Sequence, residues 1–295
     1  MQHALTPIDR EIERDVDSLA PGRDFSRRLF VQTSVGGGFA AAVLPVTAQT
    51  ISTPADGLLA GTVEIAVGDF KMPAYRAQPA GQKNLPVVLV ASEIFGVHEH
   101  IADVCRRFAR QGYLAVAPEL FARQGDAKAY TDIPKLISEV VAKAGDAQVL
   151  GDLDAALAWA GTQGGDVKRA AITGFCWGGR TTWMYAAHNP SLKAAAAWYG
   201  PVARSYFPGD KTAIERAAAL KVPVLGLYGG ADGGIPTDTL TQMEAALKAA
   251  GNSACEFVVY PDTPHAFHAD YRPSYRKAAA DDAWARCLAW FKKFV

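Results

Sequence analysis

One cysteine constrains this chain more than any other residue. Cys176 stands in the stretch 174–179 (Gly-Phe-Cys-Trp-Gly-Gly), between an apolar run at 169–173 and a helix-like stretch at 180–188. A strand, a sharp turn and a helix in this order present a nucleophile above the edge of a sheet, as in the G-x-S-x-G motif, here with sulfur in place of oxygen. The flanking glycines permit the strained turn. The positive end of the following helix favours a thiolate, so the stretch predicts a nucleophilic cysteine.

The remaining chain alternates between strand-like and helix-like patterns. An antiparallel hairpin is expected at 61–67 and 72–78, with the turn at Gly68 and Asp69. Further strands are predicted at 85–91, 113–117, 194–198, 222–228 and 256–260, and helices at 98–111, 135–143, 147–160, 238–250 and 275–294. This alternation predicts an α/β class with a mostly parallel sheet and helices on both faces. Ligands bind such sheets at the carboxyl ends of the strands.

An acid and a histidine follow later strands. Asp232 lies in the Gly-rich loop 229–234, after the strand at 222–228, and His265 follows the strand at 256–260. Taken singly, the first is typical of a plain turn and the second of a solvated loop. Together they complete the order nucleophile, acid, histidine, each after a strand. That order predicts a catalytic triad of Cys176, Asp232 and His265.

Composition excludes several other classes. The 295 residues carry no formal net charge, which argues against a nucleic-acid partner. The four cysteines are far apart and form no C-x-x-C pair, so neither a zinc site nor a redox dithiol is predicted. No metal and no cofactor is expected.

The N-terminus has the pattern of a targeting segment. Arg27 and Arg28 precede a stretch at 29–55 without charged residues, which resembles a bacterial twin-arginine export signal. We expect the signal at 1–48 and a single α/β domain at 49–295, with a periplasmic or exported product and no stable membrane association after cleavage. A membrane anchor is the first alternative, although polar residues and three glycines make the stretch weakly hydrophobic. A cytoplasmic protein with a non-functional signal is the second.

The motifs together resemble the dienelactone hydrolase family of α/β-hydrolases, over approximately residues 60–295. The marks are the stretch at 174–179, the segment 92–96 (Ser-Glu-Ile-Phe-Gly) and Pro-His-Ala-Phe at 264–267. The resemblance implies an α/β-hydrolase fold, with Cys176 as nucleophile, His265 as general base and acid, and Asp232 orienting the imidazole. It also implies that Glu93 interacts with the resting thiol and swings away when substrate enters. Like-charge repulsion would keep the cysteine protonated and inert until then.

Further residues are predicted to contact the substrate. The backbone N–H groups of Ile94 and Trp177 are expected to form the oxyanion hole. Tyr199 and the Trp177 ring line the pocket or belong to the core, and Phe267 is also assigned to substrate binding. By resemblance, Arg123 holds a substrate carboxylate. The family's second carboxylate-binding arginine is replaced by Ala269, with His268 and Arg272 as neighbours, so the sequence departs from the family pattern there.

The leading functional prediction is a hydrolase of small esters or lactones that works through a thioester acyl-enzyme. Two alternatives stay open: a non-hydrolytic small-molecule-binding protein on the same fold, and a peroxide-reactive thiol protein. The predicted partner is the substrate alone, and the predicted state is a monomer or weak homo-oligomer.

Overall fold

An eight-stranded sheet runs through the protein. The computed structural model describes residues 52–295, and its strands lie in the order β1-β2-β4-β3-β5-β6-β7-β8. The β1–β2 and β2–β4 pairs are antiparallel, whereas all other neighbours are parallel. The strands are β1 (Leu58–Val67), β2 (Phe70–Pro79), β3 (Leu85–Ala91), β4 (Leu114–Pro118), β5 (Gly165–Phe175), β6 (Ala194–Trp198), β7 (Val224–Gly229) and β8 (Glu256–Tyr260).

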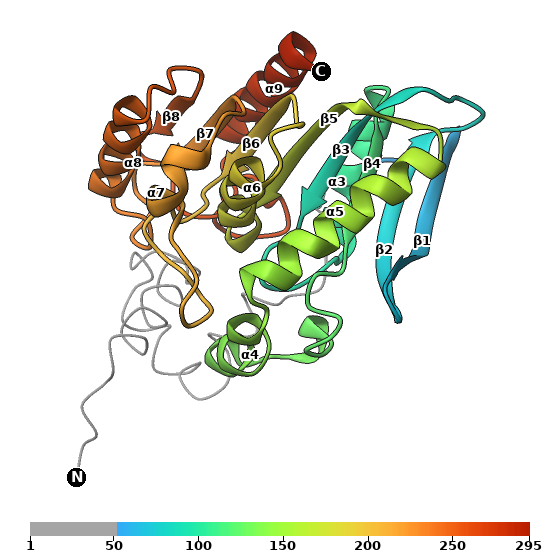
Figure 1. Ribbon diagram of the computed structural model, residues 1–295, viewed down its shortest axis with the longest axis horizontal. Coiled ribbons are helices and arrows are strands. Elements are labelled where there is room, and N and C mark those ends of the chain that lie inside the picture. The colour runs from blue at the N-terminus through green and yellow to red at the C-terminus, as the bar shows by residue number, and fades with distance from the viewer. Residues whose placement is uncertain (1–51) are drawn as a thin grey trace.

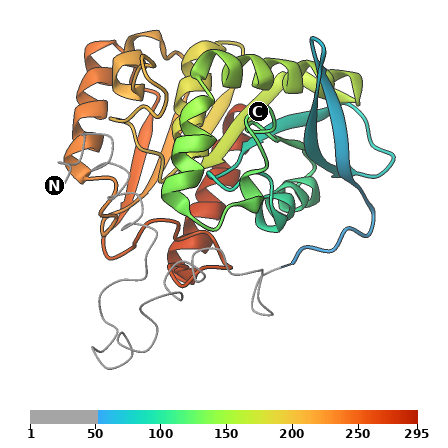
Figure 2. The same ribbon diagram turned by 90° about the horizontal axis from the view of Figure 1, so that it is seen from below.

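Helices cover both faces of the sheet. The helices α5 (Asp146–Thr162) and α6 (Trp177–His188) pack on one face, and α3 (Glu99–Arg110) and α9 (Lys277–Phe294) pack on the other. Figure 2 shows the sheet between these two layers, with the β1–β2 hairpin at one edge. The remaining helices are α4 (Ile133–Glu139), α7 (Ala213–Arg216) and α8 (Thr237–Ala249). This is the α/β-hydrolase fold that the sequence predicted.

Burial explains why the central strands read as continuous apolar runs. Every residue of β4, β6 and β7 is buried, because helices cover both sides of these strands. The sequence of β6 is Ala-Ala-Ala-Ala-Trp, and its small side chains let α6 and α9 pack closely on the two faces. The carboxyl ends of the parallel strands therefore meet at one edge of a rigid sheet.

Two local elements differ from the prediction. The helix expected at 135–143 is divided into α4 and a 3-10 turn at Val141–Lys143, because Val140 leaves the helical conformation with φ −121° and ψ −65°. The short α7 was not predicted, although Thr212 and Glu215 form a capping box at its start. No helix within residues 52–295 is long and apolar enough to span a membrane. The predicted signal at 1–48 lies outside the described residues.

Candidate active site

A strained turn places Cys176 between β5 and α6. The residue has φ 55° and ψ −118°, and its N–H donates to the Trp198 carbonyl oxygen at 3.0 Å. A Cβ atom on Gly178 would lie 2.2 Å from the Ala91 carbonyl oxygen, and one on Gly179 would lie 2.4 Å from the Trp198 carbonyl oxygen. The turn is thus wedged between the ends of β3 and β6, and only glycines fit at both positions. This backbone turn holds the Cys176 side chain at the carboxyl edge of the sheet.

The predicted acid and base are in contact. Asp232 follows β7, and its Oδ2 lies 2.6 Å from Nδ1 of His265, which follows β8. Asp232 Oδ1 accepts the Gly234 N–H at 2.9 Å, so both carboxylate oxygens are used. Burial lowers the pKa of His265, but the negative charges of Asp232 and then of Cys176 outweigh burial and hold it well above the usual value. Nδ1 is engaged by the acid, so Nε2 is the ring nitrogen left to interact with Cys176, whose side chain helps to raise the His265 pKa.

Glu93, directly after β3, lies in a buried polar cluster. Its Oε2 accepts a hydrogen bond from the Tyr271 hydroxyl at 2.8 Å, and it lies 3.4 Å from His98 Nε2 and 3.6 Å from Arg272 Nη2. Burial raises the pKa of this carboxyl, yet Arg272 and His98 bring the pKa well below the usual glutamate value. Glu93 is therefore a carboxylate in this arrangement. No hydrogen bond joins it to Cys176 among residues 52–295, and its Oε1 has no partner.

The two backbone amides predicted for the oxyanion hole make no hydrogen bond among residues 52–295. They are the N–H groups of Ile94, in the loop after β3, and of Trp177, the first residue of α6. The close approach of Gly178 to the end of β3 brings the start of α6 next to the loop that carries Ile94. The predicted oxyanion hole needs two N–H groups that lie close together.

Unpaired polar atoms gather around these residues. Eight buried side-chain N or O atoms have no hydrogen-bond partner in residues 52–295. All belong to the start of α3 or to loops at the carboxyl edge of the sheet: Ser92 Oγ, Glu93 Oε1, His98 Nε2, His100 Nε2, Tyr199 Oη, His265 Nε2, His268 Nδ1 and Arg272 Nη2. Two of these atoms, His98 Nε2 and Arg272 Nη2, lie within ion-pair distance of Glu93. An unpaired buried polar group costs about 1–3 kcal/mol. Their concentration at one place is the sign of a site that receives a polar molecule or ordered water.

Only some of the residues predicted to bind substrate lie near His265. The ring of Tyr199 lies 5.1 Å from that of His265 and 5.4 Å from that of Phe267, and both side chains are fully buried. Arg123 instead forms an ion pair with Asp152 and stacks 4.2 Å from the Phe70 ring. No contact of Arg123 reaches the triad.

Arg272, three positions after Ala269, is a buried cation next to Glu93. Its Nε donates to the Tyr271 hydroxyl at 2.9 Å, and its guanidinium lies 4.9 Å from the Phe95 ring. Cys176 and Glu93 both act on it electrostatically. Sequence reasoning noted Arg272 only as a neighbour of Ala269 and did not single out Tyr271 or His98. Their place in loops next to His265 and Glu93 was the available signal.

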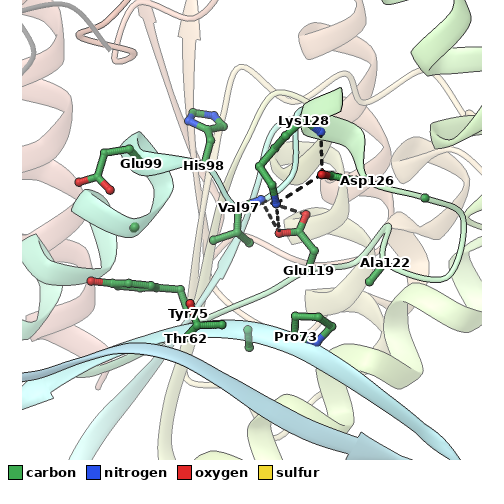
Figure 3. Close-up of a pocket in the computed structure, with 13 residues that line it drawn as sticks. Thr62, Pro73, Tyr75, Val97, His98, Glu99, Glu119, Ala122, Asp126 and Lys128 are labelled. Atoms are coloured by element: carbon green, nitrogen blue, oxygen red, sulfur yellow. Dashed lines mark hydrogen bonds and ion pairs between the residues drawn. The ribbon is translucent and has the colours of Figure 1, made fainter. Parts of the chain in front are cut away.

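A cavity of about 510 Å³ adjoins the cluster on the side of the hairpin. Figure 3 shows His98 and Glu99 on one side of it, and Glu119, Asp126 and Lys128 on the other. Lys128 Nζ lies 3.3 Å from Glu119 Oε2, so charges at this end are paired. His98 lines the cavity and also contacts Glu93. Within residues 52–295, no group of three or more His, Cys, Asp or Glu residues is arranged to hold a metal ion.

Comparisons with known proteins agree with this geometry. The model of the dienelactone hydrolase family matches residues 72–295. A protein from Methylorubrum extorquens, provisionally named a carboxymethylenebutenolidase, is 56% identical over 285 residues, which is 96% of this chain and 98% of that one. The chain belongs to the dienelactone hydrolase family.

Other members of the dienelactone hydrolase family are similar over most of their length. A protein of Escherichia coli K12 with the same provisional name is 52% identical and covers 89% of this chain and 97% of its own. A crystal structure from Klebsiella pneumoniae, provisionally named a dienelactone hydrolase, has 54% identity and a TM-score of 0.78 over 80% of this chain and 99% of its own. These likenesses show a family of hydrolases.

Proposed function

We propose that this dienelactone hydrolase family member cleaves small esters or lactones through Cys176, His265 and Asp232. One observation carries the proposal: the buried His265–Asp232 contact of 2.6 Å leaves Nε2 to act on Cys176, which is held at a strained turn. A nucleophile next to an oriented base is the arrangement that acyl transfer uses.

The reaction follows from these positions. His265 Nε2 takes the proton of the Cys176 thiol, and the resulting thiolate attacks the substrate carbonyl. The N–H groups of Ile94 and Trp177 stabilise the negative charge on the carbonyl oxygen. His265 then gives its Nε2 proton to the leaving alkoxide, and a thioester remains on Cys176. The neutral imidazole next takes a proton from water, whose hydroxide attacks the thioester and releases the acid and the thiolate.

The substrate is proposed to carry an anionic group. Arg272 is a buried cation whose Nη2 makes no hydrogen bond within residues 52–295 and lies 3.6 Å from Glu93 Oε2. A substrate carboxylate can compete with Glu93 for Arg272 and so free the Glu93 side chain, which fits its proposed role as a gate for the thiol. We assign this role to Arg272 and not to Arg123, because Arg272 interacts with both Glu93 and Cys176, whereas Arg123 is paired with Asp152 on α5.

A panel of chromogenic esters and lactones tests the proposal on the wild type, Cys176→Ala and His265→Ala. We expect hydrolysis by the wild type and a loss of at least about 10³-fold in kcat/KM for both variants. Wild-type protein that binds panel compounds without cleaving them would favour the binding-protein alternative. Peroxide consumption that depends on Cys176, without ester hydrolysis, would favour the thiol-protein alternative.

A further inference from the structure

The loop that carries His265 is tied to α3 by one buried carboxylate. Asp270 lies five residues after His265, and its side chain is 1% exposed. Its Oδ1 lies 3.1 Å from His100 Nδ1, and its Oδ2 accepts from Arg107 Nη2 at 2.5 Å. Both partners belong to α3, so Asp270 joins two segments that are about 170 residues apart in the chain.

The contact continues through a chain of charges. Arg107 Nε donates to Asp103 Oδ2 at 2.5 Å, so Arg107 bridges the two carboxylates. Asp103 Oδ1 accepts from the Thr53 backbone N–H at 2.5 Å, and Arg106 Nε donates to the Thr53 carbonyl oxygen at 2.9 Å. The earliest described residues of the chain are thus held on the same helix. The planar guanidinium of Arg107 fixes the direction of both contacts.

The two joined segments carry most of the candidate site. The segment that leads into α3 bears Glu93, Ile94 and His98, whereas the loop bears His265, Tyr271 and Arg272. Asp270 is adjacent to Tyr271, whose hydroxyl binds Glu93, and is two residues from Arg272. A shift of Asp270 would therefore move the hydrogen-bond donor and the cation that face Glu93. A displacement of about 1 Å in a catalytic group can cost about 10² in rate.

We propose that Asp270 is a positioning residue for the reaction, acting through His100 and Arg107 to hold the loop with His265 and Arg272 against the segment with Glu93 and Ile94. This rests on the proposed function. The role is distinct from that of Asp232, which contacts His265 directly. Asp270 touches no group of the triad, and both of its oxygens are engaged by α3. Burial raises its pKa, but His100 and Arg107 lower the pKa below the usual value, so Asp270 acts as a carboxylate.

Asp270→Asn and Arg107→Lys test the proposal in the full chain. Asparagine keeps the shape but loses the charge, and a single ammonium cannot bridge Asp103 and Asp270 in the planar geometry of arginine. The matched control is Asp281→Asn, which removes an exposed ion pair with Lys277 on α9. If Asp270→Asn does not fold, Arg107→Lys carries the test, because it keeps the positive charge and its position is 15% exposed.

The readout is the iodoacetamide alkylation rate of Cys176 against pH, followed by mass spectrometry of the peptide that contains it. This readout does not require hydrolysis, so it tests positioning even if the ester panel gives no turnover. We expect both variants to alkylate about tenfold more slowly than the wild type near neutral pH, because a displaced His265 no longer takes the proton of the Cys176 thiol. The alkylation rates of Asp281→Asn should equal those of the wild type at every pH.

A KM and kcat comparison adds a second criterion. If the panel gives turnover, both variants should lose at least about tenfold in kcat, whereas Asp281→Asn should not. Folded Asp270→Asn or Arg107→Lys protein with a wild-type alkylation profile would overturn the proposal, even if its thermal stability were reduced. A loss of stability alone would show a structural role only.

Discussion

At the residue scale, buried charge governs the groups around Cys176. Glu93 has no hydrogen bond to the thiol within residues 52–295, and instead Tyr271, His98 and Arg272 surround its Oε2. The positive charge of Arg272 acts on both Glu93 and Cys176. The carboxylate therefore competes with the thiolate for the same cation, which is the electrostatic basis of the proposed gate.

Replacing Glu93 by Gln should make Cys176 more reactive. Without the competing negative charge, Arg272 stabilises the thiolate more strongly, so iodoacetamide alkylation at neutral pH should be several-fold faster than in the wild type. Ester turnover should fall less than in His265→Ala, because the proton carrier remains. Unchanged or slower alkylation of the Glu93→Gln protein would show that this carboxylate does not control the thiol.

The lowered pKa of Glu93 predicts that the stability of the protein falls at acid pH. The folded-state pKa of Glu93 lies below the usual glutamate value, so its contribution is fully present above about pH 4.5 and is lost as the pH falls further. Between pH 5 and pH 3, the free energy of unfolding should fall by on the order of 1 kcal/mol more in the wild type than in Glu93→Gln. Urea unfolding at several pH values measures this difference, and parallel curves for the two proteins would argue against it.

Sequence reasoning could name the residues of the proposed triad because each follows a strand in a recognisable order. The structure brings Asp232 and His265 together at 2.6 Å, although 33 positions separate them. The ion pair of Arg123 with Asp152 on α5 was not foreseen, because nothing in the local pattern marks the pair. The same holds for Asp270, His100 and Arg107, whose contacts exist only after the chain has folded.

At the element scale, the turn between β5 and α6 depends on glycines. A Cβ on Gly179 would meet the Trp198 carbonyl oxygen and the backbone of Gly200, neither of which can move without shifting β6. Gly151, on α5, is exposed, and its Cβ would meet nothing within 4 Å. Two substitutions of the same kind are therefore expected to have opposite effects.

Gly179→Ala should destabilise the protein by several kcal/mol or prevent folding, whereas Gly151→Ala should stabilise it by about 0.5–1 kcal/mol. Alanine is the better helix former where space allows, and overpacking against backbone cannot be relieved by a rotamer change. Thermal unfolding monitored by circular dichroism gives both values. Equal midpoints for the two variants would contradict the close packing of the turn.

The ends of the helices and strands were predicted less well than their presence in the chain. The two-residue hairpin turn and the apolar strands were visible as patterns, and each predicted strand corresponds to an observed one. The strand β5 begins at Gly165, before the predicted 169, because Leu85 and Pro86 of β3 pair with Gly165 and Asp166 across an irregular register. Tertiary pairing of this kind has no local signal. The division of the helix near Val140 likewise reflects a single backbone change.

At the scale of the whole molecule, we propose that residues 1–48 direct export and that the mature enzyme acts outside the cytoplasm as a monomer or weak homo-oligomer. The twin arginines and the uncharged stretch that follows support this proposal. Periplasmic extracts should contain a chain that begins near Gln49, and replacing Arg27 and Arg28 by Lys should leave the precursor inside the cell. Active, unprocessed protein in the cytosol of the native cell would contradict it.

The most direct test of the account is to trap the acyl-enzyme. Wild-type protein is mixed with a chromogenic ester that the panel shows to be cleaved, quenched with acid within milliseconds, digested and analysed by mass spectrometry. We predict that the peptide containing Cys176 gains the mass of the acyl group, and that Cys176→Ala shows no such gain. Steady turnover with the acyl group on another residue, or with no acylated peptide and full activity in Cys176→Ala, would contradict the cysteine mechanism.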